Sequence, residues 1–286
     1  MKTKTNNTAD TLILLALRLI TYAIVLVIGY ILFDIVKNGA SALNWQFVSS
    51  FPRRSGAAGG IFPAIVGTLY LVVGTIAVSL PLGIGGAIYL AEYADQGRFN
   101  TTIRLAIVTL AGVPSIVFGL FGLGIFVLFC GFGPSILAGS LTLACMVLPT
   151  IIVASEESLR AVPKGFRDAS LALGATKWEM IRTNILPYSL SGMITGSILG
   201  IGRAAGETAP ILLTVAAFFL PRLPKSIFDQ VMALPYHLYI LATQHPEADR
   251  IRPMQYGTAL ILLLLVLGLS LGAILIRTHF RKKFRW

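Results

Sequence analysis

The sequence has few charged residues. Asp, Glu, Lys and Arg make up only 12% of its 286 residues, whereas 56% are hydrophobic. Soluble domains carry about 25% charged residues, so the composition excludes an ordinary soluble globule. Intrinsic disorder is excluded as well, because disordered chains combine low hydrophobicity with high net charge. With a mean hydropathy of +0.81, the composition favours an all-α protein that crosses a membrane several times.

Cysteine and histidine are also scarce. Cys130 and Cys145 both lie in apolar sequence, and the three histidines are far apart, so we predict neither a disulfide framework nor a metal site. Basic residues are more abundant: 23 Lys and Arg face 12 Asp and Glu, which gives a net charge of +11. They cluster between apolar runs, which indicates contact with the anionic lipid bilayer rather than with nucleic acid.

Six apolar runs are long enough to cross a bilayer, which needs about 20 helical residues per crossing. Six crossings place both termini on one side. With the termini in the cytoplasm, fifteen Lys and Arg fall on the inner side and seven on the outer side, as the positive-inside rule requires. We therefore predict cytoplasmic termini and one membrane domain over residues 1–286, with its core at 60–280. The predicted spans are residues 14–36, 62–91, 103–130, 134–155, 188–220 and 255–277.

The longest polar stretch on the predicted inner side covers residues 156–187. Its pattern predicts two short helices. The first starts near Pro163 and ends at Gly174, and the second starts with a capping box formed by Thr176 and Glu179. The first helix is amphipathic, so it is either part of an ordinary basic loop, a helix lying on lipid, or a docking helix for another protein. Its short stripe of small residues favours docking over lipid.

Within this stretch, Asp168-Ala169-Ser170, Gly174-Ala175 and Ile185-Leu186-Pro187 resemble the EAA loop of ABC importer permeases, with Asp-Ala-Ser in place of the usual Glu-Ala-Ala. The resemblance implies a coupling helix that fits a cleft on a separate cytoplasmic ATPase subunit. The residues that it assigns to ATPase coupling are Phe166, Asp168, Ala169, Ser170, Leu173 and Gly174.

The sequence contains no G-x-x-x-x-G-K-[ST] phosphate-binding loop and no catalytic dyad. We therefore expect no catalytic residues, no enzymatic activity and no bound cofactor on this chain. If it is part of an ATP-driven pump, ATP and Mg²⁺ are bound by the partner ATPase.

A charged pair interrupts the fifth apolar run, in Gly202-Arg203-Ala204-Ala205-Gly206-Glu207-Thr208-Ala209-Pro210. A charge at the centre of a membrane helix costs about 2.5–3.5 kcal/mol on insertion scales, so such residues are functional by default. Arg203 and Glu207 are four residues apart and share a helix face. They form either a structural ion pair or an anion site, in which the planar guanidinium of Arg203 binds an oxyanion and Glu207 holds it in position. The predicted pathway residues are Arg203, Glu207, Thr208 and Ser115, the last following an expected kink at Pro114.

This run also resembles the signature of the transmembrane subunits of the phosphate-specific (Pst) importer, and its Glu-Thr-Ala-Pro ending is more similar to the PstA type than to the PstC type. Supporting similarity covers residues 60–220 and includes Pro81-Leu82-Gly83-Ile84, Tyr89-Leu90-Ala91-Glu92-Tyr93 and Val113-Pro114-Ser115-Ile116-Val117-Phe118-Gly119-Leu120. The resemblance implies a six-span type I ABC importer permease (MetI-like) fold that imports inorganic phosphate across the cytoplasmic membrane of a prokaryote. The implied partners are a PstC-like permease, two PstB-like ATPases and a PstS-like extracytoplasmic phosphate-binding protein.

Two alternatives remain open. An ABC permease for another oxyanion, such as molybdate or sulfate, should keep the coupling loop but lack the charged run. A secondary anion transporter should show inverted repeats or a second charged span. Residues 34–60 form an outer loop that is either flexible or a landing surface for the binding protein.

Overall fold

The computed structural model describes residues 7–95 and 97–283, and most of these residues are helical. Five helices are long and apolar enough to cross a membrane, and a bent pair of helices adds a sixth crossing when it is counted as one span. They correspond to the six predicted apolar runs. The helices concerned are α1 (Asn7–Gly39), α3 (Phe62–Ile88), the pair α4 (Arg98–Ala111) and α5 (Ser115–Gly122), α6 (Ile136–Arg160), α9 (Leu186–Gly206) and α12 (Arg252–Lys283).

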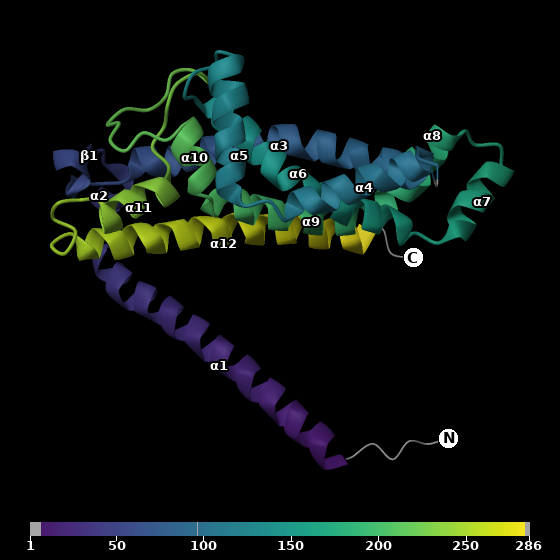
Figure 1. Ribbon diagram of the computed structural model, residues 1–286, viewed down its shortest axis with the longest axis horizontal. Helices are drawn as coiled ribbons and strands as arrows, with labels where there is room; N and C mark the ends of the chain where they lie inside the picture. Colours follow the sequence, from purple (N-terminus) through teal and green to yellow (C-terminus); the bar gives the residue numbers. More distant parts are fainter. Residues whose placement is uncertain (1–6, 96, 284–286) are drawn as a thin grey trace.

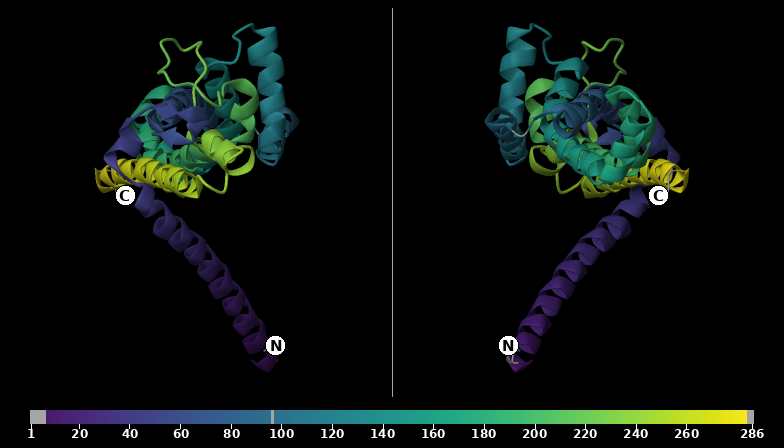
Figure 2. Two further views of the ribbon diagram at one scale, coloured as in Figure 1. Left: turned by 90° about the vertical axis from the view of Figure 1, so that its left-hand side faces the viewer. Right: turned by 90° about the vertical axis from the view of Figure 1, so that its right-hand side faces the viewer.

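Helix α6 lies at the centre of the bundle between α3 and α9, and α12 runs along α9 (Figure 1). Two thirds of the apolar stretch of α6 is buried (67%), and its residues Leu143, Met146 and Ile151 form the core with Ile211 and Val215. By contrast, α1 leaves the bundle and is exposed over most of its length (Figures 1 and 2).

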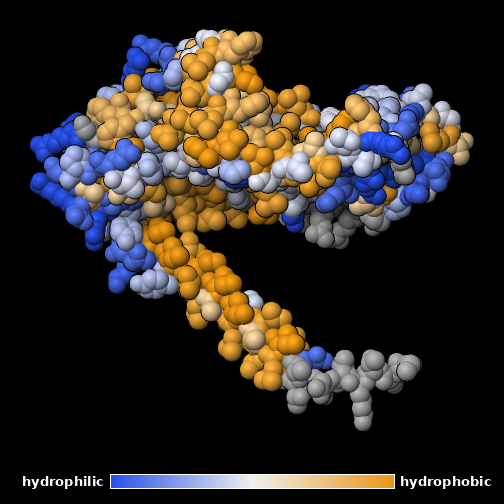
Figure 3. Space-filling view, viewed as in Figure 1, coloured by the Kyte–Doolittle hydropathy of each residue, from blue (hydrophilic) through white to orange (hydrophobic). Residues whose placement is uncertain are grey.

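The surface is apolar along α1 and over the middle of the bundle, and hydrophilic at the two ends (Figure 3). An exposed apolar helix such as α1 is unfavourable in water but stable in lipid, where its backbone groups are satisfied within the helix. The arrangement therefore fits a bilayer around the middle of the molecule.

The third predicted run is not a straight span. Helices α4 and α5 meet at 104°, across the break at residues 112–114. Pro114 explains the break, because a proline disfavours helical backbone at the preceding residue, here Val113. The expected kink is thus confirmed, but it is far sharper than a kink within one helix. Beyond α5 the chain continues as a π-helical turn, η4 (Leu123–Phe129).

The fifth predicted run, 188–220, is broken near Pro210, as expected for a run that is longer than one span. Helix α9 ends at Gly206, and Glu207 is extended with φ −74° and ψ 137°. Pro210 then occupies the first turn of a short helix, α10 (Ala209–Thr214), because proline fits that position but cannot continue a preceding helix. The charged pair therefore lies at the end of a helix and not at its centre.

The two ends of the bundle carry the shorter elements. At one end, near the C-terminal end of α12, lie α7 (Lys164–Ala172) and α8 (Lys177–Met180), and the π turn η5 (Ile181–Ile185) joins α8 to α9. The π turn η3 (Tyr89–Tyr93) continues α3. At the opposite end, residues 40–60 are folded and not an open loop. They comprise η1 (Ala40–Ala42), α2 (Trp45–Ser49), β1 (Pro52–Arg53), η2 (Arg54–Gly56) and β2 (Ala58–Gly59), with β1 antiparallel to β2, and α11 (Leu234–Thr243) lies beside them.

Candidate functional site

The charged pair of the fifth run is an ion pair. Nε of Arg203 donates to Oε1 of Glu207 at 3.2 Å. Arg203 is in the last turn of α9, where a positive charge is favourable because the carboxyl end of a helix carries a partial negative charge. Both side chains are partly open, at 37% and 17% exposed. The pair is therefore not enclosed by the packed core of this chain.

The neighbours of the pair are packed into the core. Ala204 and Ala205 are buried, and Ala204 belongs to the same apolar cluster as Phe118 of α5 and Ile211 of α10. Gly206, by contrast, has open space where a side chain would lie. The backbone of this segment is thus fixed on one side by packing, while the other side leaves room next to the ion pair.

The other two predicted pathway residues lie nearby in the fold but are not bonded to the pair. Thr208 is half-buried and precedes α10. Ser115 begins α5 and shares a face of it with Gly119, four residues on, whose added Cβ would lie 3.0 Å from Cα of Pro210. Among the described residues, no hydrogen bond joins Ser115 to Arg203 or Glu207. The structure therefore places the Ser115 face of α5 on α10, just beyond the ion pair.

The second predicted site, in residues 156–187, has the expected local structure. Pro163 precedes the first helical residue of α7. Gly174 has φ +85°, the left-handed conformation that closes a helix at low cost for glycine. Thr176 and Glu179 form both hydrogen bonds of the capping box that starts α8. These local predictions are confirmed.

The predicted coupling residues divide between two faces of α7. Phe166 packs on Tyr188 with ring centroids 5.2 Å apart, and the hydroxyl of the buried Ser170 accepts a hydrogen bond of 2.5 Å from Asn184. These two residues therefore fix α7 to its own chain. The exposed members are Asp168, Ala169, Leu173 and Gly174, and Leu173 is 89% exposed at the tip of the loop.

Sequence reasoning missed a group of ion pairs behind this loop. Glu92 of η3, only 5% exposed, pairs with Arg167 of α7 at 2.6 Å. Beside it, Glu156 of α6 pairs with Arg104 of α4 at 2.8 Å and with Arg160 at 3.0 Å. Glu92 and Arg104 thus each pair with a residue of another helix. The available signal is opposite charges at helix ends on the same side of the membrane, but a spacing of 75 residues hides the pairing.

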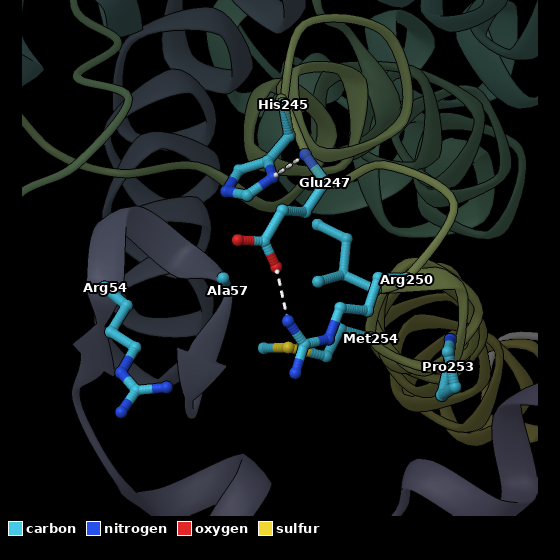
Figure 4. Close-up of a pocket in the computed structure, with 8 residues that line it drawn as sticks. Arg54, Ala57, His245, Glu247, Arg250, Pro253 and Met254 are labelled. Carbon is cyan, nitrogen blue, oxygen red and sulfur yellow. Dashed lines mark hydrogen bonds and ion pairs between the residues drawn. The ribbon is translucent and has the colours of Figure 1, made fainter.

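A pocket lies at the opposite end of the bundle from α7 (Figure 4). It is open to solvent, has a volume of about 320 Å³, and is lined by residues that include Arg54, His245, Glu247 and Arg250. Glu247 pairs with Arg250 at 3.5 Å, and Arg54 approaches from the hairpin across the pocket. The sequence offers no pattern for it, because its walls come from segments about 190 residues apart.

An all-α bundle with apolar crossings, an ion pair at a broken helix and a protruding helix–turn–helix loop defines a membrane transport subunit. Residues 83–286 match the family described as "Binding-protein-dependent transport system inner membrane component". The chain therefore belongs to this family, and it is a multi-pass permease subunit of an ABC importer.

Similar sequences and structures agree with this assignment. The probable ABC transporter permease protein YqgI of Bacillus subtilis is 35% identical over 87% of this chain and 88% of its own. The phosphate transport system permease protein PstA 1 of Mycobacterium tuberculosis is 37% identical over 77% of this chain and 71% of its own.

Solved structures share the fold at low identity. A chain of a bacterial ABC transporter involved in import of the acidic polysaccharide alginate has a TM-score of 0.68 at 15% identity, covering 96% of this chain and 97% of its own. A chain of the inward-facing MetNI methionine ABC transporter has a TM-score of 0.60 at 17% identity, covering 77% and 94%. The predicted type I, MetI-like permease fold is thus confirmed.

Proposed function

We propose that this chain is a transmembrane subunit of an importer for inorganic phosphate. The observation that carries the proposal is the Arg203–Glu207 ion pair at the junction of α9 and α10, within a chain whose relatives include phosphate transport system permeases. A guanidinium donates two parallel hydrogen bonds to an oxyanion and keeps its charge at any physiological pH. Arg203 offsets the cost of bringing a phosphate ion into the low dielectric of the membrane, and Glu207 holds the guanidinium in place when no anion is bound.

The second half of the proposal concerns the α7 loop. Its exposed residues Asp168, Ala169, Leu173 and Gly174 dock on a partner ATPase, and Phe166 and Ser170 hold the docking helix in position. ATP and Mg²⁺ bind to that partner, and this chain binds no cofactor. In this arrangement α7 faces the cytoplasm, and both termini lie on the same side.

The remaining partners follow from the same arrangement. A second, PstC-like permease subunit completes the pathway, and two PstB-like ATPases dock on the two permeases. A PstS-like phosphate-binding protein delivers the anion at the opposite end, where the folded 40–60 segment and the Arg54–Arg250 pocket lie. One solved structure with the same fold, a bacterial alginate ABC transporter at 14% identity, is in complex with an alginate pentasaccharide-bound periplasmic protein.

Labelled phosphate uptake by phosphate-starved cells that depend on this transporter tests the pathway. We expect Arg203→Gln to abolish uptake at a normal level of the protein in the membrane, because the anion then has no counter-charge. Arg182→Gln is the matched control, since Arg182 is exposed on η5 and forms no ion pair among the described residues. Full uptake by the Arg203→Gln variant would assign the pair a purely structural role.

Docking is tested by recovering the complex through a tag on this chain. We expect Asp168→Lys to lower the amount of co-purified ATPase. Asp95→Lys makes the same charge change at an exposed position of the turn after η3, at the same end of the molecule, and should leave recovery unchanged. Equal recovery for both variants would contradict docking on α7.

A different oxyanion is the second candidate, because Arg203 would bind sulfate or molybdate through the same geometry. Competition of each anion with labelled phosphate separates the two cases. Phosphate transport predicts competition by arsenate, which shares its charge and shape, and little by sulfate or molybdate.

A further inference from the structure

The guanidinium of Arg167 is the most highly bonded side chain of the α7 loop. Its Nε lies 3.2 and 3.3 Å from the two carboxylate oxygens of Glu92, and its Nη2 lies 2.6 Å from Oε1. The same group donates to the carbonyl oxygens of Val162 at 2.6 Å and Leu159 at 2.8 Å. One side chain of α7 thus joins the end of α3 to the carboxyl end of α6.

The two carbonyls lie at the carboxyl end of α6 and just beyond it. Leu159 is in the last turn of α6, where carbonyl oxygens lack the usual partner four residues on, and its oxygen also accepts a bond of 3.3 Å from the N–H of Val162. A positive charge at that place is also favoured by the partial negative charge of the helix end. Arg167 therefore caps α6 with two bonds while it pairs with Glu92.

Glu92 connects α7 to the end of α3, which is not adjacent to the loop in sequence. Helices α6, α7 and α9 follow one another in sequence, so a displacement of α7 reaches α6 and α9 through the backbone. Glu92, in the π turn that continues α3, lies 75 residues before Arg167, and side-chain contacts join this end of α3 to the α7–α8 loop. These contacts include the Glu92–Arg167 pair, the ammonium of Lys177 in α8, which lies 4.8 Å from the ring of Tyr93, and an apolar cluster.

The apolar cluster and the ion pair do different things. The cluster joins Ala87 of α3 with Leu159, Val162 and Ile185, and such packing resists separation but is not directional. A buried ion pair adds little net stability compared with apolar residues of the same size, but it requires one geometry. The hydrogen bonds from the guanidinium of Arg167 to the carboxylate of Glu92 therefore fix the position of α3 relative to α7.

We propose that Glu92 and Arg167 are positioning residues that transmit movement of the docking helix α7 to α3, so that ATP hydrolysis by the partner moves α3, α6 and α9 as one body. This proposal rests on the proposed docking of an ATPase on α7. Without the pair, the partner still docks and hydrolyses ATP, because the exposed face of α7 is unchanged. The movement of α3 is then less firmly tied to that of α7, and less substrate crosses for each ATP consumed.

The test measures anion uptake and ATP hydrolysis together, in proteoliposomes that contain the complete transporter and its loaded binding protein. Glu92→Gln removes the charge and leaves the caps from Arg167 to α6 in place. We expect a normal amount of ATPase in the complex and a rate of hydrolysis close to wild type. Uptake per ATP should fall about two- to thirty-fold, the range that a single residue contributes to coupling between distant sites.

Two further variants separate coupling from folding. Glu157→Gln is the matched control, because Glu157 is exposed on α6 at the same end and forms no ion pair among the described residues. Arg167→Lys keeps the positive charge but loses the planar guanidinium that donates to both oxygens of Glu92, so its uptake per ATP should lie between those of wild type and Glu92→Gln. If Glu92→Gln does not accumulate in the membrane, Arg167→Lys is the test variant.

The possible outcomes discriminate between this proposal and the proposed function. Unchanged uptake per ATP in Glu92→Gln, or a parallel fall of uptake and hydrolysis, would overturn the role of the pair. A wild-type complex that carries no ATPase would instead contradict the docking on α7.

Discussion

Arg203 and Glu207 meet at the last turn of α9, with Nε 3.2 Å from Oε1, and both side chains remain partly accessible to solvent. Helix α9 spans 21 residues from Leu186 to Gly206. It starts next to the α7 loop, and the ion pair lies at its other end, about 30 Å away. One rigid helix therefore connects the proposed docking site with the proposed anion site. In the proposed function a phosphate replaces the carboxylate of Glu207 on Arg203, because both oxyanions bind a guanidinium through the same N–H groups.

The geometry of this exchange predicts the effect of Arg203→Lys. Lysine keeps the charge but offers a single ammonium in place of the planar fork, so we expect phosphate uptake about tenfold below wild type and clearly above that of Arg203→Gln. Uptake rates at equal protein levels measure the difference. Wild-type uptake by Arg203→Lys would show that charge alone is sufficient and would contradict bidentate binding.

Helix α3 lies in close contact with residues 231–232. This contact predicts that alanine substitution of two glycines of α3 changes stability to very different extents. A Cβ on Gly67 would lie 2.0 Å from the carbonyl oxygen of Met232 and 2.9 Å from Cβ of Val231. Gly67→Ala should therefore lower the free energy of unfolding by about 1–3 kcal/mol, because the backbone of one partner must move. Thermal unfolding in detergent measures the loss.

Gly85 is the control for this substitution. Its added Cβ has nothing within 4 Å, and alanine is favoured over glycine in a helix by about 1 kcal/mol. Gly85→Ala should leave the melting temperature unchanged or raise it. Equal melting temperatures for the two variants would mean that α3 and residues 231–232 are not in contact.

The turn between α7 and α8 can be tested with a second pair of glycine variants. Gly174 has φ +85°, so Gly174→Ala places a side chain in the left-handed region, at a cost of about 1–2 kcal/mol. We expect faster amide exchange around this turn and less co-purified ATPase. Gly165→Ala, in α7 with open space around its Cβ, is the control and should match wild type. Unchanged exchange in Gly174→Ala would contradict the left-handed turn.

The fold could be predicted from the sequence where local chemistry decides it. Length and hydropathy locate all six apolar runs, and the glycine and the capping box locate the ends of α7 and α8. The sharp bend at Pro114 and the end of α9 at Gly206 could not be placed from hydropathy, since apolar residues continue through both breaks. Proline marks each of them, but its effect depends on tertiary packing, such as that of Gly119 on Pro210.

The candidate sites could be predicted only in part, for a related reason. Arg203 and Glu207 are four residues apart, so their pairing follows from helix geometry alone. Glu92 and Arg167 are 75 residues apart, and their pairing depends on how α3 packs against the α7 loop. The position of Ser170 could not be predicted either. As a small residue it suggests an open docking surface, but its side chain is buried and its hydroxyl accepts a hydrogen bond from Asn184 on the inner face of α7.

A buried histidine predicts how stability depends on pH. His237 of α11 is 1% exposed and packs on Gly56 of the hairpin, whose added Cβ would lie 3.3 Å from Cε1 of His237. Burial lowers the pKa of this imidazole from 6.5 to about 4, because the charged form is poorly solvated in the interior. In the unfolded chain the same group binds a proton at its ordinary pKa.

The sign of the effect follows from these two values. Above pH 6.5 the histidine is neutral in both states and adds no pH dependence. Between pH 6.5 and about 4 the unfolded state binds more protons, so the free energy of unfolding falls as the pH falls, by on the order of 3 kcal/mol at most. Replacing the imidazole by an apolar side chain of similar size removes this dependence. We therefore expect the drop in melting temperature from pH 7 to pH 4.5 to be smaller in His237→Leu than in wild type. His279→Gln, which changes an exposed histidine of α12, should keep the full drop; an equal drop in His237→Leu would mean that the imidazole is protonated in the folded protein.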